Sequence, residues 1–546
     1  MSRFDEILND LKKVIYPNFE ITYFDPYRKH FYIKTKLENL LDAAKFLLSI
    51  DARIVHVTAS DMGFNGIKIM HFYSLEHLEP HAHLIIYAYT ERDSPKAPSL
   101  AQLTYQVHWA ERETMELLGV EFQGHPDPRH LFLPFEWPNP VESSSEYVKG
   151  KFRNVVLPIG PYHPSMIEGG FFKIVVDGEE ILDVDIKVGL SHRGIMRLAE
   201  NRTLHRDVFL IGRICGICSI PHQFAFVNTI EKILRMQVPE RAEYIRILMA
   251  ELNRIHSHLL WLGVSGDLIG FKSLLMWAWK IREPVQDCTE LLSGNRVHAD
   301  AIIIGGVRFD VSSTQIEKVE KKLYDVKKEV NSLMELIYSH SIVRKRTEDI
   351  GKLLLPKAKE AGAVGPTARA SGWKIDVRRD SPYSFYDESH LTWDVITDDG
   401  CDVFSRVLVR VKEILVSIDI CLQCLDMLKK IGGQVVNRDI PLSFNGEALS
   451  KVEAPRGELF YYVHLRDSSI PHTVRIRTPS YRNIPTLKFM LPGYKLSDAP
   501  IIIGSVDPCF SCTDRVIIID KKKSEERILN YEEFKNIFLK EGSKCI

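Results

Sequence analysis

The chain has 546 residues, a length that predicts three or four domains at roughly 150 residues each. Apolar residues make up 45% and charged residues 26% of the chain, and this globular composition excludes wholesale disorder. With 71 basic and 72 acidic side chains the formal charge is −1, so we expect no nucleic-acid partner, because such proteins usually carry a basic excess.

The sequence shows no pattern typical of a membrane span, a signal peptide or a disulfide scaffold. No apolar run free of charges reaches the roughly 18 residues that a membrane span needs. The first residues (MSRFDEILNDLKK) carry charges where a signal peptide needs an apolar stretch, so we expect a cytoplasmic chain. Nine cysteines are too sparse for a disulfide scaffold, which makes any that cluster better candidates for metal ligands or redox groups.

The N-terminal unit, residues 1–134, is predicted to be a small α/β domain. Residues 40–48 have a helical pattern, and residues 52–60 and 83–90 are strands rich in β-branched and aromatic side chains. A proline-rich and serine-rich stretch follows, which blocks regular structure. We therefore place a linker at residues 135–155.

The second unit, residues 156–515, is predicted to be mainly α-helical with β segments at its two ends. An extended segment at 171–186 opens it. A helix with apolar residues at three–four spacing then begins at Ser313 or Thr314, which is a plausible N-cap.

A further helix runs from about Val403 to the break at Gly432 and Gly433. Residues 516–546 contain a lysine run and an amphipathic helix, and we interpret them as a C-terminal extension. The fold class expected for the whole chain is α+β.

Six of the nine cysteines form three CxxC pairs: Cys215 and Cys218, Cys421 and Cys424, Cys509 and Cys512. The middle pair continues an apolar helical stripe, so we expect it to be ordinary core. The outer pairs interrupt helical patterns, and their four thiolates would suit zinc, an iron–sulfur cluster, copper(I) or nickel. Spacing alone leaves a functional metal and a structural zinc both open.

Two motifs contain these outer pairs and resemble a known family. RICGICSIPH (213–222) has the form RxCGxCxxxH and DPCFSC (507–512) has the form DPCxxC. Each motif alone is moderately specific. Together and in this order they resemble the large subunit of nickel–iron hydrogenases.

Other segments resemble respiratory complex I. HWAERETMELLGVEFQGHPDPRHLFLP (108–134) resembles its 30-kDa subunit. GPYHPSMIEGG (160–170), GPTARASGWKIDVRRDSPYSFY (365–386) and EAPRGE (453–458) resemble its 49-kDa subunit and the complex-I-like hydrogenases. A chain that joins both parts resembles the large subunits of formate hydrogenlyase and related membrane-bound, energy-converting hydrogenases.

The resemblance implies reversible cleavage or formation of dihydrogen at a nickel–iron centre. Cys215 and Cys509 would be terminal nickel ligands, and Cys218 and Cys512 would bridge nickel to an iron with diatomic carbon monoxide and cyanide ligands. Cys509 would also serve as a base for the proton. Strongly donating thiolates stabilise the higher nickel states.

Three further residues match functional positions of that family. Glu168 matches the glutamate that relays protons from the metal, and an ordinary exposed loop acid is its alternative. Arg456 matches the arginine that overhangs the open metal position, and a structural salt bridge is its alternative. His222 matches a histidine that hydrogen-bonds a ligand sulfur, and a satisfied core histidine is its alternative.

Partners and location also follow from the resemblance alone. It implies a small subunit with the iron–sulfur clusters, membrane ion-pumping subunits, and an electron-donor module based on formate dehydrogenase, carbon monoxide dehydrogenase or ferredoxin. Attachment would be peripheral, at the inner face of the cell membrane. A maturation endopeptidase would cut after Arg515 and remove residues 516–546.

The sequence departs from the family at the expected magnesium site. Many hydrogenases carry a glutamate 19 positions before the first nickel cysteine, and here that position is Met196. The histidine that usually closes the DPCxxC motif is replaced by Arg515. Both changes argue against the usual magnesium site.

Two other functions compete with the hydrogenase interpretation. The first is a fused subunit of a complex-I-type quinone reductase, a family that lacks both outer cysteine pairs. The second is a zinc-stapled scaffold that joins partner subunits. A scaffold accounts for four thiolates but leaves Glu168 and Arg456 without a role.

Overall fold

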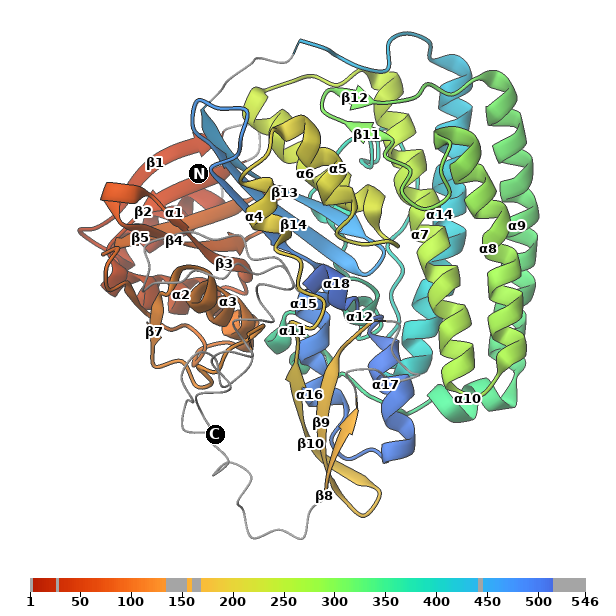
Figure 1. Cartoon of the computed structure of the whole chain (residues 1–546), viewed down its shortest axis with the longest axis horizontal. Coiled ribbons are helices and arrows are strands. Elements are labelled where there is room, and N and C mark those ends of the chain that lie inside the picture. Colours follow the sequence, from red (N-terminus) through yellow and green to blue (C-terminus); the bar gives the residue numbers. More distant parts are fainter. Residues whose placement is uncertain (1–2, 26–28, 134–154, 160–167, 440–444, 514–546) are drawn as a thin grey trace, which may run out of the picture.

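The computed structural model describes residues 3–25, 29–133, 155–159, 168–439 and 445–513. The predicted C-terminal extension, and the predicted linker apart from residue 155, lie outside these described residues. Within them the chain combines several small sheets with a bundle of long helices (Figure 1).

The N-terminal unit is built on a five-stranded sheet with the strand order β1-β2-β5-β4-β3. Its strands are β1 (Glu20–Asp25), β2 (His30–Lys34), β3 (Arg53–Asp61), β4 (Ile67–Ser74) and β5 (His83–Thr90). The pair β2 and β5 is parallel, and the other neighbours are antiparallel. Its helices are α1 (Arg3–Val14), α2 (Leu40–Ser49) and α3 (His108–Leu118). The predicted helix at 40–48 and the strands at 52–60 and 83–90 are confirmed to within a residue.

Long helices dominate the second unit. Helices α7 (Glu240–Leu268), α8 (Lys272–Ser293), α9 (Ser313–Ser339) and α14 (Val403–Lys430) stand side by side in Figure 1. Helix α6 (Ser219–Leu234) lies apart from this bundle and packs on β13 and β14. Helix α7 is buried around most of its circumference because α8 and α14 pack on it from two sides. A helix that is covered on all sides can bury charged residues only when they are paired, and α7 contains several such residues.

The N-cap of α9 differs from the prediction. Ser312, not Ser313 or Thr314, caps the helix, and its hydroxyl accepts from the backbone N–H of Gln315. The Gln315 side chain in turn accepts from the Ser312 backbone N–H at 2.9 Å. This reciprocal capping box satisfies two donors at once, so the helix starts where a glutamine stands three residues after a serine.

Strands occupy both ends of the second unit, as predicted. At its start lie β8 (Val155–Ile159), β9 (Phe171–Asp177) and β10 (Glu180–Lys187), and at its end lie β13 (Gly446–Ala454), β14 (Gly457–Leu465) and β15 (Thr473–Arg477). The predicted extended segment at 171–186 is the antiparallel hairpin of β9 and β10. The predicted α+β fold class is confirmed.

Shorter elements connect these parts. They are β6 (Lys96–Pro98), β7 (Glu121–Gln123), α4 (Ile195–Ala199), α5 (Leu204–Gly212), β11 (Ile302–Ile303), β12 (Gly306–Val307), α10 (Ser341–Thr347), α11 (Leu355–Ala361), α12 (Gly365–Arg369), α13 (Val377–Asp380), α15 (Pro479–Asn483), α16 (Leu487–Met490), α17 (Ala499–Ser505) and α18 (Phe510–Thr513). Among the helices that the structure describes, none is both long and apolar enough to cross a membrane.

The two units share a buried interface between their sheets. An aromatic and aliphatic cluster joins β3, β4 and β5 to β13 and β14, and it includes Phe72, Phe460 and Tyr462. Arg53 also crosses the boundary, because its Nη1 donates to Glu458 Oε1 at 2.8 Å. Apolar burial and a buried ion pair therefore fix the N-terminal sheet against the hairpin of β13 and β14.

Candidate metal centre

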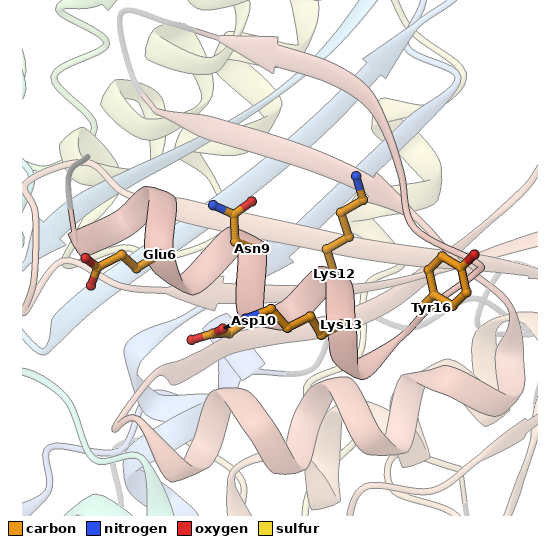
Figure 2. A pocket seen from close by; sticks show the side chains of 6 residues that line it. All are labelled: Glu6, Asn9, Asp10, Lys12, Lys13 and Tyr16. Atoms are coloured by element: carbon orange, nitrogen blue, oxygen red, sulfur yellow. Dashed lines mark hydrogen bonds and ion pairs between the residues drawn. The ribbon is translucent and has the colours of Figure 1, made fainter.

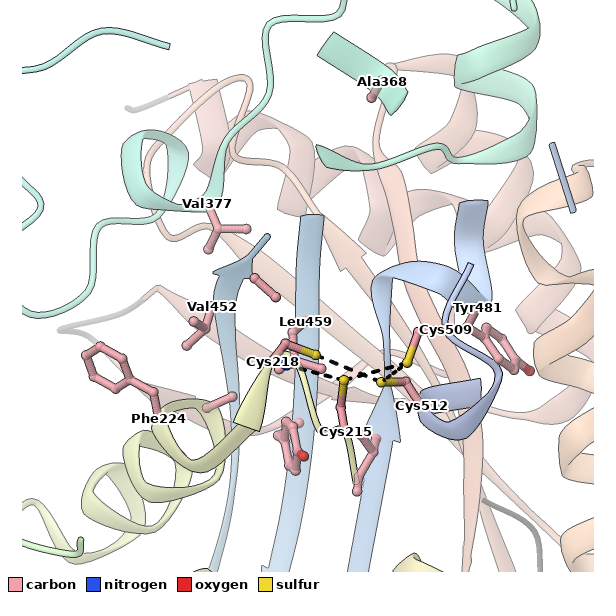
Figure 3. Packing of buried hydrophobic residues seen from close by; sticks show 14 of the residues in the cluster. Cys215, Cys218, Phe224, Ala368, Val377, Val452, Leu459, Tyr481, Cys509 and Cys512 are labelled. Carbon is pink, nitrogen blue, oxygen red and sulfur yellow. Dashed lines mark hydrogen bonds between the residues drawn. The ribbon is translucent and has the colours of Figure 1, made fainter. Parts of the chain in front are cut away.

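The four cysteines of the outer pairs meet at one buried point, although the pairs are far apart in sequence (Figure 3). The Sγ atoms of Cys215 and Cys509 are 3.7 Å apart, and those of Cys218 and Cys512 are 3.9 Å apart. Cys509 and Cys512 lie 2.7 Å from each other, sulfur to sulfur. Four sulfur donors around a common centre are a soft ligand set for a transition metal.

The first pair sits at the start of helix α6. Cys215 and Cys218 close a tight loop in which the backbone N–H groups of Ile217 and Cys218 both point at Cys215 Sγ, at 3.3 Å. Asn253 of α7 holds the loop from behind, because its Nδ2 donates to the Ile217 carbonyl at 2.8 Å. Backbone N–H groups directed at a sulfur favour its thiolate form.

The second pair follows helix α17. Asp507 adopts a left-handed backbone conformation with φ 53°, and Pro508 follows it, so the chain turns sharply before Cys509. The Cys509 backbone N–H donates to Ser480 Oγ at 3.0 Å. Cys512 lies in the single-turn helix α18. The prediction that this motif lies outside a helix is therefore correct for Cys509 and wrong for Cys512.

Arg193 joins the two cysteine segments. Its Nη1 donates to the Arg213 carbonyl at 2.8 Å, and its Nη2 donates to the carbonyls of Ile214 at 2.6 Å and Ser511 at 2.8 Å. One guanidinium group therefore bonds both to the residue before Cys215 and to a residue between Cys509 and Cys512. A lysine could not make these directed contacts, because it lacks the planar fork.

The thiols of the four cysteines do not share one protonation preference. Hydrogen bonds from neighbouring thiols lower the pKa of Cys215 well below its usual range. The interaction with Cys215 raises the pKa values of Cys218 and Cys509, and burial raises the pKa of Cys512. One thiolate therefore suppresses ionisation of its neighbours, so a cation is needed to hold all four as thiolates.

Arg456 lies in the two-residue turn that joins β13 and β14. Its Nε donates to the Asp507 carbonyl at 2.8 Å, and its Nη2 donates to Asp507 Oδ1 at 2.7 Å. Desolvation would lower the pKa of Arg456, but the charge of Asp507 and the nearby cysteines outweighs it and raises the pKa well above its ordinary value. The salt bridge predicted as the alternative exists, and it directs this cation toward the sulfur cluster.

Nη1 of Arg456 and Oδ2 of Asp507 are buried and have no hydrogen-bond partner among the described residues. Buried polar atoms of this kind usually face a ligand or a water. The Arg456–Asp507 pair thus leaves one donor and one acceptor for a group bound beside the cysteines.

Glu168 lies beside the second cysteine pair and is partly buried. Its Oε1 is 3.9 Å from Cys509 Sγ, and its Oε2 accepts from the Ser511 backbone N–H at 2.8 Å. A carboxylate at this position can exchange a proton with the Cys509 sulfur. The structure therefore does not place Glu168 as a fully exposed loop acid.

His222 is fully buried one helical turn after Cys218. Its Nδ1 lies 2.7 Å from the hydroxyl of Tyr461 on β14. A ring nitrogen also lies within 4.8 Å of the sulfurs of Cys218 and Cys512. His222 thus borders the sulfur cluster, and Tyr461 fixes the orientation of its ring.

The remaining predicted residues fall outside the centre. Cys421 and Cys424 are buried in α14 among apolar side chains, as expected for core cysteines. Met196, which stands at the family's magnesium-ligand position, is buried in the core on α4. Arg515 lies outside the described residues.

Sequence reasoning missed the residues that hold the cysteine segments in place. Asn253, Ser480 and Asp507 all bond to these segments or to Arg456, and the Arg193 fork joins them. Asp507 had one visible signal, its position directly before Pro508 in the motif. The contacts of Arg193, Asn253 and Ser480 join residues far apart in the sequence, so local pattern does not predict their partners.

A surface hollow elsewhere offers no comparable chemistry. It measures about 770 Å³ and lies over α1, lined by Glu6, Asn9, Asp10, Lys12, Lys13 and Tyr16 (Figure 2). Asp10 and Lys13 already pair across one turn at 2.8 Å. Without a thiol or imidazole, this hollow is not a site for a soft metal.

Three family models match the chain. Residues 33–148 match the 30 Kd subunit of respiratory-chain NADH dehydrogenase, and residues 268–444 and 439–515 match its 49 Kd subunit. Residues 193–263, which include the first cysteine pair, match nickel-dependent hydrogenase. The chain thus combines the features of both groups, as its sequence motifs predicted.

Curated relatives divide between the same two groups. Formate hydrogenlyase subunit 5 of Escherichia coli (strain K12) is 35% identical over 81% of this chain and 81% of the relative. A subunit of the NADH-quinone oxidoreductase of Aquifex aeolicus (strain VF5) is 28% identical over 89% of this chain and 94% of the relative. The match of residues 193–263 to nickel-dependent hydrogenase and the buried four-cysteine cluster favour the hydrogenase group. The chain belongs to the family of complex-I-like nickel–iron hydrogenase large subunits.

A solved structure of a respiratory membrane complex shares the fold of this chain. A chain of the membrane-bound sulfane sulfur reductase, an archaeal respiratory membrane complex, superposes with a TM-score of 0.63 at 30% identity. The match covers 66% of this chain and 98% of that chain. The family implies a nickel–iron centre, and the four buried sulfurs with a nearby carboxylate and guanidinium fit such a group.

Proposed function

We propose that this chain is the catalytic subunit of a proton-reducing hydrogenase, interconverting two protons, two electrons and dihydrogen. The observation that carries the proposal is the convergence of four buried cysteine sulfurs with Glu168 and Arg456. A structural zinc site would need the four sulfurs but would need neither a partly buried carboxylate at the Cys509 sulfur nor a buried guanidinium beside it.

In this proposal the four cysteines would hold the nickel–iron centre, with Cys215 and Cys509 as terminal nickel ligands and Cys218 and Cys512 as ligands that the nickel would share with the iron. When bound, this centre supplies the redox chemistry that makes or splits dihydrogen. The protein contributes a dry, rigid ligand set, because all four cysteines are buried and both pairs are anchored by hydrogen bonds to neighbouring segments.

Protons enter and leave through Glu168. Cys509 Sγ holds a proton and donates it to Glu168 Oε1, 3.9 Å away. The Ser511 N–H fixes the other carboxylate oxygen, so the proton-accepting oxygen stays directed at the sulfur. A proton relay needs this fixed geometry, because proton transfer falls off steeply with distance and angle.

Arg456 stabilises negative charge beside the cysteines. Asp507 accepts from Nε and Nη2 on one edge of the Arg456 guanidinium, which leaves Nη1 for the bound group. Because this cation is already fixed in position, the surrounding protein does not have to reorganise when negative charge develops next to it. His222, held by Tyr461, would donate to or accept from the neighbouring sulfurs and so adjust their electron density.

The assembly that we propose follows the relatives. A small subunit would carry the iron–sulfur clusters, and membrane subunits of the ion-pumping type would attach the chain peripherally to the inner face of the membrane. Formate dehydrogenase, carbon monoxide dehydrogenase or a ferredoxin would supply electrons. A maturation endopeptidase would remove residues 516–546, and the units would divide at residues 134 and 156.

Metal analysis of the complex, purified without oxygen from its native host, tests the function. We expect one nickel per chain and hydrogen evolution from a reduced low-potential donor. Zinc in place of nickel would contradict the proposal and favour a scaffold. Absence of both metals together with quinone reduction would instead favour the quinone-reductase alternative.

A further inference from the structure

A second group of charged side chains lies buried inside the helical unit, away from the cysteine ligands. Its members are Arg254, Arg369, Arg378, Glu251, Asp376, Glu413, Glu453 and His258, and we call them the arginine–carboxylate cluster. Each of these side chains is at most 2% exposed. They come from α7, α12, α13, α14 and β13 and from the residue before α13, so only the folded chain assembles them.

Direct contacts connect every member. Arg369 Nε donates to Glu413 at 2.7 Å, and Arg369 Nη1 donates to Glu453 at 2.8 Å. His258 Nε2 lies 2.9 Å from Glu413. The cluster is therefore one electrostatic unit rather than a set of separate ion pairs.

The second half of the cluster is joined through Asp376 and Glu251. Arg378 donates to Asp376 at 2.8 Å and to Glu251 at 3.1 Å, and Arg254 Nε donates to Glu251 at 3.1 Å. Asp376 also lies 3.4 Å from Arg369, which links the two halves.

The charges of the cluster do not balance. It contains four carboxyl groups and three guanidinium groups, and burial lowers the pKa of His258 to about 4, which leaves its ring neutral. Within this bonded set, fully ionised carboxylates would exceed the guanidinium groups by one. The nearby Arg410 bonds to the backbone carbonyls of Arg406 and Ser505 and lies over the Trp261 ring, so its printed contacts are not to a carboxylate of the cluster. Proteins avoid an uncompensated buried charge by taking up a proton.

Glu453 and Glu413 each bond to one guanidinium, that of Arg369. The second donor of Glu453 is the backbone N–H of Val377 at 3.2 Å, whereas Glu413 has His258 at 2.9 Å. Glu251 accepts from Arg254 and Arg378 and also from the hydroxyls of Ser417 and Tyr386. Burial, together with the charge of Asp376, raises the pKa of Glu453 to about 7, whereas the pKa of Glu251 is held at about 2.

The cluster touches the hairpin that presents Arg456 to the cysteines. Arg254 donates to the backbone carbonyls of Glu453 at 2.6 Å and Ala454 at 3.1 Å, directly before the turn. Figure 3 shows two neighbours of the cluster in the same close-up as the four cysteines. They are Val377, which follows Asp376, and Val452, which precedes Glu453. A charge change at Glu453 therefore acts on the strand that leads into the turn of Arg456.

We propose that Glu453 carries one exchangeable proton for the arginine–carboxylate cluster, which makes the cluster a buried proton-storage site beside the metal centre. Release converts the Glu453 carboxylic acid into a carboxylate plus one proton. Asp380, partly exposed on α13 and bonded through Oδ2 to the Asp376 N–H at 2.9 Å, is the group nearest solvent. The proposal depends on the proposed function only for the use of this proton, not for its existence.

The titratable groups around Glu453 come from several elements. They comprise Arg254 and Glu251 on α7, Arg369 on α12, Asp376, Arg378 and Asp380 around α13, Arg410 and Glu413 on α14, Tyr383 and Tyr386 after α13, and Lys451 on its own strand. Of these cations, Lys451 is the one that lies on a strand. Lys451 ion-pairs with Glu76 and lies 3.5 Å from Glu458. Because these two carboxylates hold the Lys451 ammonium, we expect it not to neutralise Glu453, which therefore keeps its proton.

Infrared spectroscopy of the intact, metal-loaded complex tests the proposal. The carbonyl stretch of a buried carboxylic acid should be present at about pH 6 and lost as the pH rises past about 8. Glu453→Gln should remove this pH-dependent band. Asp376→Asn should also remove it although Glu453 remains, because three carboxylates then balance three guanidinium groups.

Glu447→Gln is the matched control, since Glu447 lies on the same strand but pairs with Lys68 outside the cluster. It should retain the band. Asp207 and Glu111 are also buried carboxyl groups with raised pKa values, so the Glu453 band is isolated in difference spectra. A wild-type-minus-Glu453→Gln spectrum without a pH-dependent carboxylic-acid band, or a Glu453 band that keeps its wild-type pH midpoint in Asp376→Asn, would overturn the proposal. Nickel content and hydrogen evolution are measured on the same samples, so a complex without hydrogenase activity but with the band refutes only the proposed function.

Discussion

Arg193 and Ser511 lie 318 positions apart in the sequence, yet Arg193 Nη2 donates to the Ser511 carbonyl at 2.8 Å. The same guanidinium also bonds to the carbonyls of Arg213 and Ile214, directly before Cys215. The distance between the two cysteine pairs therefore depends on a residue that is itself no ligand.

Replacing Arg193 should therefore lower metal occupancy. We expect Arg193→Ala to lose most of its nickel, and Arg193→Lys to recover little, because an ammonium cannot bond three separated carbonyls in one plane. Arg344→Ala is a suitable control, since Arg344 pairs only at the surface with Glu348. Nickel content of the purified complexes, measured by mass spectrometry, decides the matter, and full occupancy in Arg193→Ala would contradict it.

The two kinds of CxxC pair should respond differently to serine substitution. Cys509→Ser should abolish nickel binding, because a hydroxyl is a poor ligand for a soft metal. Cys424→Ser changes a buried core thiol of α14 and should leave nickel content close to that of the wild type, at some cost in stability. Equal nickel loss in both variants would show that the loss reflects misfolding.

Glu168→Gln should separate metal binding from catalysis. We expect nickel to be retained while hydrogen evolution falls about 100-fold or more, because the amide cannot carry a proton from Cys509 Sγ. Glu168→Asp should keep part of the activity. Glu180→Gln on the neighbouring hairpin serves as the control, and unchanged activity in Glu168→Gln would exclude this carboxyl as the relay.

Arg456→Lys should reduce turnover without removing the metal. The substitution keeps a positive charge but loses the forked contact with Asp507, so we expect hydrogen evolution to fall about 100-fold. Double substitution with Asp507→Asn should cost little more than the single change, because the pair acts as a unit. Additive losses would argue that the two residues act independently.

Asp207 should make stability depend on pH. Its carboxyl is fully buried on α5, its oxygens have no hydrogen-bond partner among the described residues, and burial raises its pKa from 3.8 to about 8. The folded state then binds a proton that the unfolded state has released, so stability falls as the pH rises from about 4 to about 8.

Asp207→Asn removes this dependence because an amide does not ionise. Thermal unfolding should show the variant to be more stable than the wild type at about pH 8.5, by on the order of a few kcal/mol. The difference should shrink toward about pH 5. A difference that is the same at both pH values would show that ionisation of Asp207 is not its cause.

Local pattern accounts for much of the fold. Strands β3 and β5 and helices α2 and α14 were predictable because burial imposes a period of two or of three to four on short stretches of sequence. The N-cap of α9 was placed one or two residues late, because the serines and threonine at 312–314 are equivalent until the side chain of Gln315 selects among them.

The metal site was predictable only in part, for a related reason. Cys215, Cys218, Cys509 and Cys512 stand in short motifs, so the sequence alone names them. The residues that position them, such as Arg193 and Asn253, act across long sequence separations. The arginine–carboxylate cluster could not be predicted as a unit for the same reason, since its members come from segments that lie far apart in the sequence.

The separation of the two cysteine pairs also sets an order of events in time. Cys215 and Cys509, whose sulfurs end 3.7 Å apart, are separated by 294 residues. At a synthesis rate of about 5–20 residues per second, the second cysteine leaves the ribosome about 15–60 seconds after the first. During that interval Cys215 and Cys218 are reduced thiols without their partners. Any factor that delivers the metal must therefore either wait for a finished chain or shield the first pair while the second is still being made.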